Sequence, residues 1–205
     1  MSVYPVHYSV ERPERCSRLQ LGLRLIAFLA LGAVGLSFGL VFVFAYLALP
    51  VFAASRLAAT DREHYANEDA PRLLRALHWF AAISGWAGLV VEQLPGRRPD
   101  ESLQLTIDGS GHADGSAVAW RVVKGLPSAF VLVLLLFLGW FVWMWAALSI
   151  LLTERIGPGA FRYLVGLQRW SVRLLAYQGG LIDDYPPFSF SDQPPILPPA
   201  RVAGQ

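Results

Sequence analysis

Residues 129–152 read AFVLVLLLFLGWFVWMWAALSILL, and this stretch decides the fold class. The 29 positions between Lys124 and Glu154 contain no charged residue. About 20 apolar residues are enough for an α-helix to cross the roughly 30 Å hydrocarbon core of a bilayer. A buried helix of a water-soluble domain would carry a polar stripe at helical spacing, and this stretch has none. It therefore predicts a transmembrane helix, strongest between Pro127 and Thr153.

A second run of the same kind lies nearer the N-terminus. The 31 positions between Arg24 and Arg56 carry no charge and include LVFVFAYLALPVFAA at 40–54. Three arginines precede the run, as in a signal peptide, but the run is about twice as long as the apolar region of one. We therefore expect an uncleaved anchor, strongest between Ala27 and Ala53.

Composition agrees with a membrane protein. Of the 205 residues, 55% are hydrophobic and only 16% are charged, which is too apolar for an ordinary soluble domain. A formal net charge of +2 indicates no nucleic-acid surface. Cys16 is the one cysteine, so no internal disulfide is possible, and with four scattered histidines it forms no zinc pattern.

The sequence has weak internal similarity when it is aligned with itself at a fixed offset. At an offset of 97, VHYSVE at 6–11 falls on LQLTID at 103–108 and Arg24 falls on Arg121. At an offset of 91, Trp79 falls on Trp170 and Glu92 on Asp183. The order and common spacing of these weak matches predict a tandem repeat of one unit, made of a strand, a long helix and a second helix.

The repeat gives the expected organisation of the chain, an α-helical integral membrane protein with short β-strands. The first repeat, 1–98, has a strand at 3–10, a membrane helix at about 20–54 and a second helix at about 71–93. The second, 99–190, has a strand at 102–108, a membrane helix at about 117–153 and a second helix at about 160–182. Residues 191–205 form a proline-rich tail, which we expect to be an extended contact segment. The strands alternate apolar and polar residues, as half-buried strands do, and we expect them to pair with each other or with another subunit.

The second helix of each repeat has two interpretations. The last helix carries Arg162, Arg169 and Arg173 on one stripe. It either lies in the headgroup layer with this stripe toward phosphates, or is embedded with its arginines toward the protein interior. We favour four membrane-embedded helices, because a tandem duplication then leaves both strands on the same side of the membrane.

Two motifs resemble a known family. One segment reads YPVHYSVERPERCSR at 4–18, and the other reads RWSVRLLAYQGGLIDDYPPF at 169–188. These segments resemble a bacterial membrane-domain family known only as a domain of unknown function, and the resemblance covers most of 3–190. The loop TERIGPGAFR at 153–162 departs from the TGRYPRGLFD-like loop of that family. The resemblance implies a membrane location, in the bacterial inner membrane as a multi-pass protein, and no established reaction.

The closing segment supplies most of the candidate functional or partner-contact residues. Asp183, Asp184 and Tyr185 follow the last helix, where carboxylates oppose the helix dipole and a nearby cation is expected. The structural alternative is that DDYPP ends the helix in the headgroup layer, with Tyr185 as an interface anchor. Arg169, Trp170 and Arg173 precede them, and His78 aligns with Arg169.

No cofactor is predicted, but some contacts stay open as hypotheses. Trp140, Trp143 and Trp145 lie deep in the second membrane helix, where a flat apolar ligand such as a quinone or pigment would fit. His78 could be an axial haem ligand, although an isolated membrane histidine is more often a packing residue. No hydrolase or nucleotide-binding pattern occurs, and the glycine-rich IDGSGHADGSA at 107–117 is interpreted as a turn.

Three functions follow from these patterns. The first is a non-enzymatic accessory or scaffold subunit of a larger membrane complex, in contact with lipid and with other membrane subunits or further copies of itself. The second is a transporter or channel component with an arginine-lined anion site. The third and least supported is a membrane enzyme acting on lipid, because no nucleophile, base and orienting group come together in the sequence.

Overall fold

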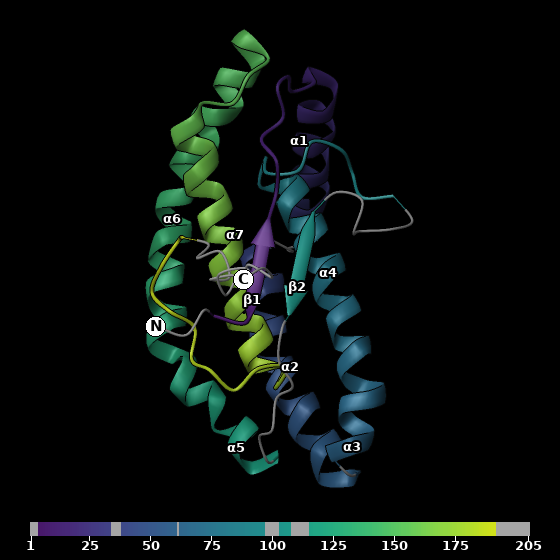
Figure 1. Cartoon of the computed structure of the whole chain (residues 1–205). Helices are drawn as coiled ribbons and strands as arrows, with labels where there is room; N and C mark the ends of the chain where they lie inside the picture. The colour runs from purple at the N-terminus through teal and green to yellow at the C-terminus, as the bar shows by residue number, and fades with distance from the viewer. Residues whose placement is uncertain (1–3, 34–37, 61, 97–102, 108–114, 192–205) are drawn as a thin grey trace, which may run out of the picture.

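The computed structural model describes residues 4–33, 38–60, 62–96, 103–107 and 115–191. This part of the chain is mostly helical, with two short strands (Figure 1). In chain order the elements are β1 (Val6–Ser9), α1 (Arg18–Ala33), α2 (Phe38–Ala59), α3 (Arg62–His64), the π-helix η1 (Tyr65–Asp69), α4 (Ala70–Ala87), β2 (Gln104–Ile107), α5 (Gly115–Ala119), α6 (Arg121–Thr153) and α7 (Pro158–Gln178).

The two strands form an antiparallel sheet with each other. Val6 lies opposite Ile107, and Tyr8 lies opposite Leu105. Val6, Tyr8 and Leu105 are buried, whereas Ser9 is exposed, so the predicted alternation is confirmed. Of the strands expected over 3–10 and 102–108, the structure describes Val6–Ser9 and Gln104–Ile107, and residues 3, 102 and 108 lie outside the described residues. The sheet covers the side of the molecule formed by α7 and α4 (Figure 1).

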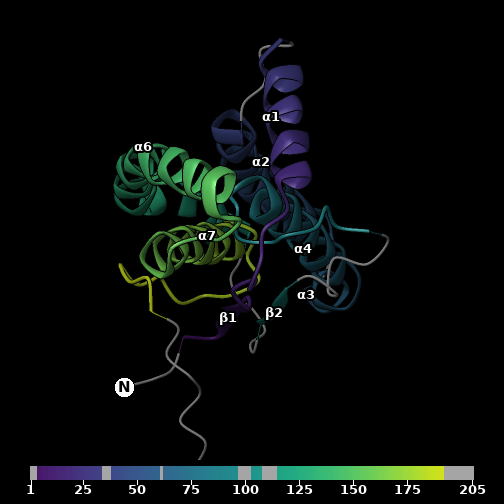
Figure 2. The ribbon, with the colours of Figure 1, turned by 90° about the horizontal axis from the view of Figure 1, so that it is seen from above.

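Helix α7 is the centre of the structure. It contacts α6, α4, α2 and β1, and Figure 2 shows it alongside α6 and above the sheet. Nearly every side chain from Leu164 to Gln178 is buried or half-buried. Pro158 lies in its first turn, where the missing N–H breaks no helical hydrogen bond. A helix with three arginines therefore forms the core, which the contacts below explain.

In the part of the chain that the structure describes, two segments are long and apolar enough to cross a membrane, Gly39–Ala59 and Ala117–Thr153. Only 22% of each apolar window is buried within the protein. Along α6, large apolar side chains are exposed from Leu126 to Leu152, with Trp145 70% exposed. Burying such a surface in lipid is strongly favourable, so length, composition and exposure together support a membrane protein.

The first apolar run differs from the single helix expected over about 20–54. The structure divides it between α1 and α2, and residues 34–37 lie outside the described residues, as do 192–205 of the expected tail. In the second run, the helix expected over about 117–153 is α6, which begins at Arg121 and follows the short α5. Pro127 therefore lies inside the helix, where the carbonyl of Val123 loses its helical donor.

Candidate functional site: arginines bonded to backbone carbonyls

The guanidinium group of Arg169 extends from α7 to the outer edge of β1. Its Nε and Nη2 atoms donate to the carbonyl oxygen of Tyr8 at 3.1 and 2.9 Å, and its Nη1 donates to the carbonyl of Phe190. One turn along α7, Arg173 is 2% exposed and donates to the carbonyl of Val6 at 3.4 Å. A two-stranded sheet has unpaired carbonyl groups along both edges. The two arginines therefore occupy the edge of β1 that faces α7.

His78 has the corresponding place at the edge of β2. Its Nε2 lies 3.0 Å from the carbonyl oxygen of Leu105, so this nitrogen carries the proton in the contact. Tyr8 and Leu105 are paired in the sheet. Their carbonyls point outward, one toward Arg169 of α7 and the other toward His78 of α4. The ring nitrogen considered above as a haem ligand is thus engaged with the backbone.

Arg121, the first residue of α6, is enclosed by the end of α7. Its Nη1 donates to the carbonyls of Tyr177 and Ile182 at 2.7 and 2.5 Å, and its Nη2 lies 2.5 Å from Oδ1 of Asp183. The guanidinium carbon also lies 4.7 Å from the centroid of the Tyr177 ring. The cation expected near Asp183 is therefore an arginine of a different helix.

Arg24 makes a similar set of contacts in the first half of the chain. It is 1% exposed, and its Nη2 donates to the carbonyls of Val91 and Glu92, both at 2.7 Å. The carboxylate of Glu92 lies 3.8 Å away, and the ring of Trp86 lies 5.6 Å from the guanidinium carbon. Among the described residues, Nε and Nη1 of Arg24 have no hydrogen-bond partner.

The other predicted site residues have separate roles. Trp170 is 3% exposed and its indole N–H donates to the Ser128 hydroxyl at 2.8 Å. The backbone carbonyl of Asp184 accepts from the Tyr4 hydroxyl at 3.2 Å. Tyr185 is 38% exposed and its ring packs against that of Tyr177. The structure therefore brings Asp183 to Arg121 and does not make a shared site of Asp183 and Asp184.

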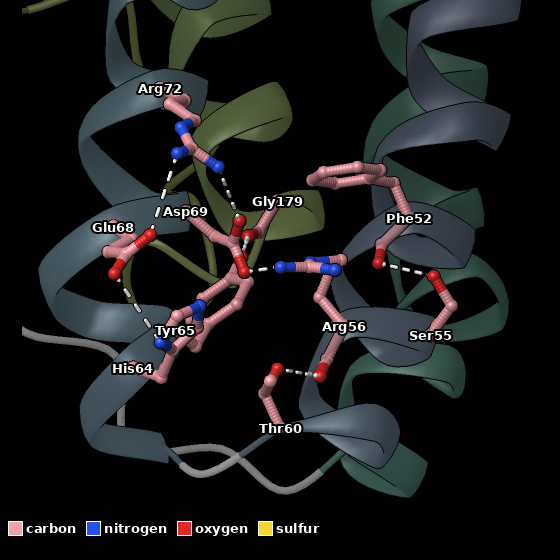
Figure 3. Close-up of polar contacts among 10 residues, drawn as sticks. All are labelled: Phe52, Ser55, Arg56, Thr60, His64, Tyr65, Glu68, Asp69, Arg72 and Gly179. Atoms are coloured by element: carbon pink, nitrogen blue, oxygen red, sulfur yellow. Dashed lines mark hydrogen bonds and ion pairs between the residues drawn. The ribbon is translucent and has the colours of Figure 1, made fainter.

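A buried carboxylate, that of Asp69, lies near the C-terminal end of α2 (Figure 3). It was not among the site residues predicted from the sequence. Asp69 is 1% exposed, and its Oδ2 accepts from Nε of Arg56 at 2.9 Å, while Arg72 lies 3.6 Å from its Oδ1. Nearby, Tyr65 donates to the carbonyl of Gly179 at 2.5 Å, and burial raises the pKa of Tyr65 to about 12. Asp69 and Tyr65 lie in η1, and only folding brings them to Arg56 of α2 and to Gly179 at the end of α7.

The deep tryptophans of α6 are arranged around a cavity of about 470 Å³. The rings of Trp140 and Trp143 are stacked at 5.7 Å, and the indole N–H of Trp143 donates to the Ala87 carbonyl at 2.9 Å. Both residues line the cavity, whereas Trp145 is 70% exposed on the outer face of α6. In the described ranges, histidine, cysteine and carboxylate side chains form no group of three that could hold a metal ion.

Sequence reasoning missed Arg24 and Arg121 as site residues. Their signal was present, since each stands at the beginning of an apolar run and the two coincide at an offset of 97. A charge in that position is expensive to bury unless it is paired and hydrogen-bonded. Asp69 gave no such signal, because it lies among other charged residues.

Comparison with known proteins gives one match. Residues 116–189, which hold nearly all of α5, all of α6 and α7, and the segment that follows, match the model of a family described as a domain of unknown function, DUF4389. This part of the chain is therefore similar to an uncharacterised family. No curated protein and no solved structure matches the chain.

Proposed function

We propose that this chain is a multi-pass protein of the bacterial inner membrane and a non-enzymatic accessory or scaffold subunit of a larger membrane complex. The observation that carries the proposal is the set of hydrogen bonds made by the interior arginines. Arg24, Arg121, Arg169 and Arg173 all donate to backbone carbonyls of the chain itself. Such contacts fix the position of chain segments, which is the task of a structural subunit.

We further propose that the chain consists of two copies of one unit, as the sequence offsets suggested. Arg24 contacts Val91 and Glu92, and Arg121 contacts Ile182 and Asp183. Each residue of the first set lies 97 or 91 positions before its counterpart in the second. The residues that the two sequence offsets relate thus make the same kind of contact in both halves, which supports duplication.

The turns that follow α4 and α7 also support this proposal. The N–H of Gly88 donates to the carbonyl of Ser84 at 2.8 Å, and the N–H of Gly179 donates to that of Leu175 at 2.8 Å. The next residue has positive φ in both turns, 61° at Leu89 and 70° at Gly180. Residues other than glycine seldom adopt this conformation, so its recurrence 91 positions apart is informative.

The proposed copies exchange their strands. His78 of the first unit contacts Leu105 of the second, whereas Arg169 of the second contacts Tyr8 of the first. Both pairs of positions are related by the same two offsets. The exchange makes each unit complete only in the presence of the other, which suits a rigid scaffold.

The contacts of Arg169 and Arg173 favour the scaffold over the anion transporter. A guanidinium group that lines an anion path must present N–H groups to the path. Here both groups face backbone carbonyls of β1 and of the segment after α7. In proteoliposomes, Arg169→Gln and Arg173→Gln would alter an anion flux of the parent protein if the transporter hypothesis held.

The outer face of α6 is the surface that we assign to a partner subunit. Phe141, Met144 and Trp145 are each more than half exposed there. Aromatic and methionine side chains are enriched in interfaces between proteins. Lipid alone requires only apolar character, so the aromatic and methionine side chains at this place favour a protein neighbour.

The test is gentle detergent extraction followed by native mass measurement. We expect a species heavier than one chain, and we expect Trp145→Ala to release the partner. Phe130→Ala is the matched control, because Phe130 is similarly exposed and lies nearer the N-terminal end of α6. This variant should keep the mass of the complex unchanged. A stable monomer in the unaltered extract would count decisively against a scaffold role.

A further inference from the structure

The cavity of about 470 Å³ lies where α1, α2, α4, α6 and α7 meet. Its walls are mostly carbon, and its polar side chains are Ser84, Gln168 and Ser171. The lining residues of α6, from Leu136 to Trp143, lie near the middle of the 37-residue apolar segment Ala117–Thr153. In a bilayer, this cavity therefore lies at the depth of the hydrocarbon core.

Gln168 leaves one hydrogen-bond donor available at the cavity wall. Its Nε2 donates to the carbonyl of Ser84 at 2.9 Å, and its Oε1 lies 3.0 Å from the Ser84 hydroxyl. A primary amide has two N–H groups. In the described part of the chain, the second N–H of Gln168 has no acceptor. An N–H group in an apolar wall gains most from a ligand that carries a carbonyl oxygen.

The aromatic wall favours a flat ligand. Trp140 and Trp143 lie parallel, with an angle of 5° between their rings, and both line the cavity. Offset stacking on an indole stabilises a planar ring beyond its area of contact. A lipid acyl chain would require neither this wall nor the amide donor.

A second cavity of about 330 Å³ lies between α2, α4 and α7. Phe80 lines both cavities, so the two share this residue as a wall. The second cavity is lined only by apolar residues, among them Ala45, Leu77 and Leu175. This shape suits a flexible hydrocarbon tail.

We propose that the two cavities bind a prenylated quinone. Its ring lies against Trp140 and Trp143, one carbonyl accepts from Gln168, and its isoprenoid tail passes Phe80 into the second cavity. The inference rests on the proposed membrane location, because such a ligand reaches the protein through the bilayer. It concerns binding only and includes no electron transfer.

The test uses the full chain in quinone-free nanodiscs with decylubiquinone as the probe, followed by quenching of tryptophan fluorescence. We expect saturable binding at one site. Gln168→Met keeps the size of the side chain and removes the donor, and should weaken binding roughly three- to tenfold, the worth of one hydrogen bond. Gln104→Met, on the exposed outer face of β2, is the matched control and should leave affinity unchanged.

A second pair of variants tests whether the hydrocarbon tail of the quinone binds in the second cavity. Ala45→Leu fills part of the second cavity and should weaken binding of decylubiquinone but not of the same ring without its decyl tail. Ala30→Leu, exposed on α1 and outside both linings, is its control.

Two results would overturn the quinone proposal. One is the lack of saturable binding, and the other is equal displacement by dodecane together with no effect of Gln168→Met, which would identify a hydrocarbon-chain site. Carbonate washing of membranes separates this failure from that of the proposed function. A chain that resists washing but binds no quinone overturns the quinone site alone, whereas a chain that washes off overturns the membrane location.

Discussion

Arg169 and Tyr8 are 161 residues apart in the chain, yet two guanidinium nitrogens of Arg169 donate to the Tyr8 carbonyl at 3.1 and 2.9 Å. This contact joins the last helix to the first strand. The arginine supplies the hydrogen-bond donors that a further strand would have supplied at this edge of β1. Because Arg173 and His78 contact strand carbonyls in a similar way, a small sheet is held against a helical core by side chains from two helices.

Arg169→Gln should lower the free energy of unfolding by about 2 kcal/mol, because a buried carbonyl loses two charge-assisted donors. Reversible unfolding in mixed detergent micelles measures the change. Arg162→Gln, an exposed substitution on the same helix, should stay within about 0.5 kcal/mol of the unaltered protein. Equal effects of the two variants would show that the contact with Tyr8 contributes little.

Arg121→Met should destabilise the protein more than Arg24→Met. Removing Arg121 takes the donor from the carbonyls of Tyr177 and Ile182, a loss of about 2–3 kcal/mol for buried acceptors. The Asp183 side chain is 41% exposed, so loss of its contact with Arg121 adds little. Arg24 lies farther from its carboxylate, at 3.8 Å, and two of its nitrogens, Nε and Nη1, have no partner in the described residues, so its removal also relieves a burial cost. The same unfolding measurement gives the order, and the reverse order would contradict this account.

Gly180→Ala should cost about 1–2 kcal/mol of stability. Gly180 has φ of 70°, in the left-handed region, and the nearest atom to an added Cβ is 3.4 Å away. The cost is therefore backbone strain rather than a steric clash. Gly22→Ala, in the middle of α1 with no atom within 4 Å of the added carbon, should instead stabilise the protein by about 0.5–1 kcal/mol. A tolerated Gly180→Ala would argue against a strained turn.

Cys16 should react slowly with iodoacetamide at pH 8. Burial, followed by the negative charge of Glu92, raises the pKa of Cys16 to about 11. A raised pKa keeps the thiol protonated, and only the thiolate is the nucleophile. The rate should therefore rise about tenfold per pH unit up to about pH 11, whereas the unfolded chain should level off near pH 9. A plateau near pH 9 in the folded protein would contradict the raised pKa.

Much of the helical architecture follows from local sequence. The uncharged runs predict the two candidate spans because a bilayer requires about 20 apolar residues in succession, and the alternation around Tyr8 and Leu105 predicts two strands. The split between α1 and α2 was not predicted, because the run has no charged residue to mark a boundary. Arg169 and Arg173 were selected as candidates, but their partners lie in β1 and beyond α7, which no spacing within a helix indicates.

By itself, the sequence determined which segments are apolar enough for a membrane, where the strands lie and which positions recur at offsets of 97 and 91. Only the tertiary structure decided what the charged side chains do. A guanidinium group gains its stability from acceptors within about 3 Å, and for Arg169, Arg121 and Arg24 these include backbone carbonyls 56 or more positions away along the chain. The backbone presents the same carbonyl at every residue, so only folding selects the ones that pair.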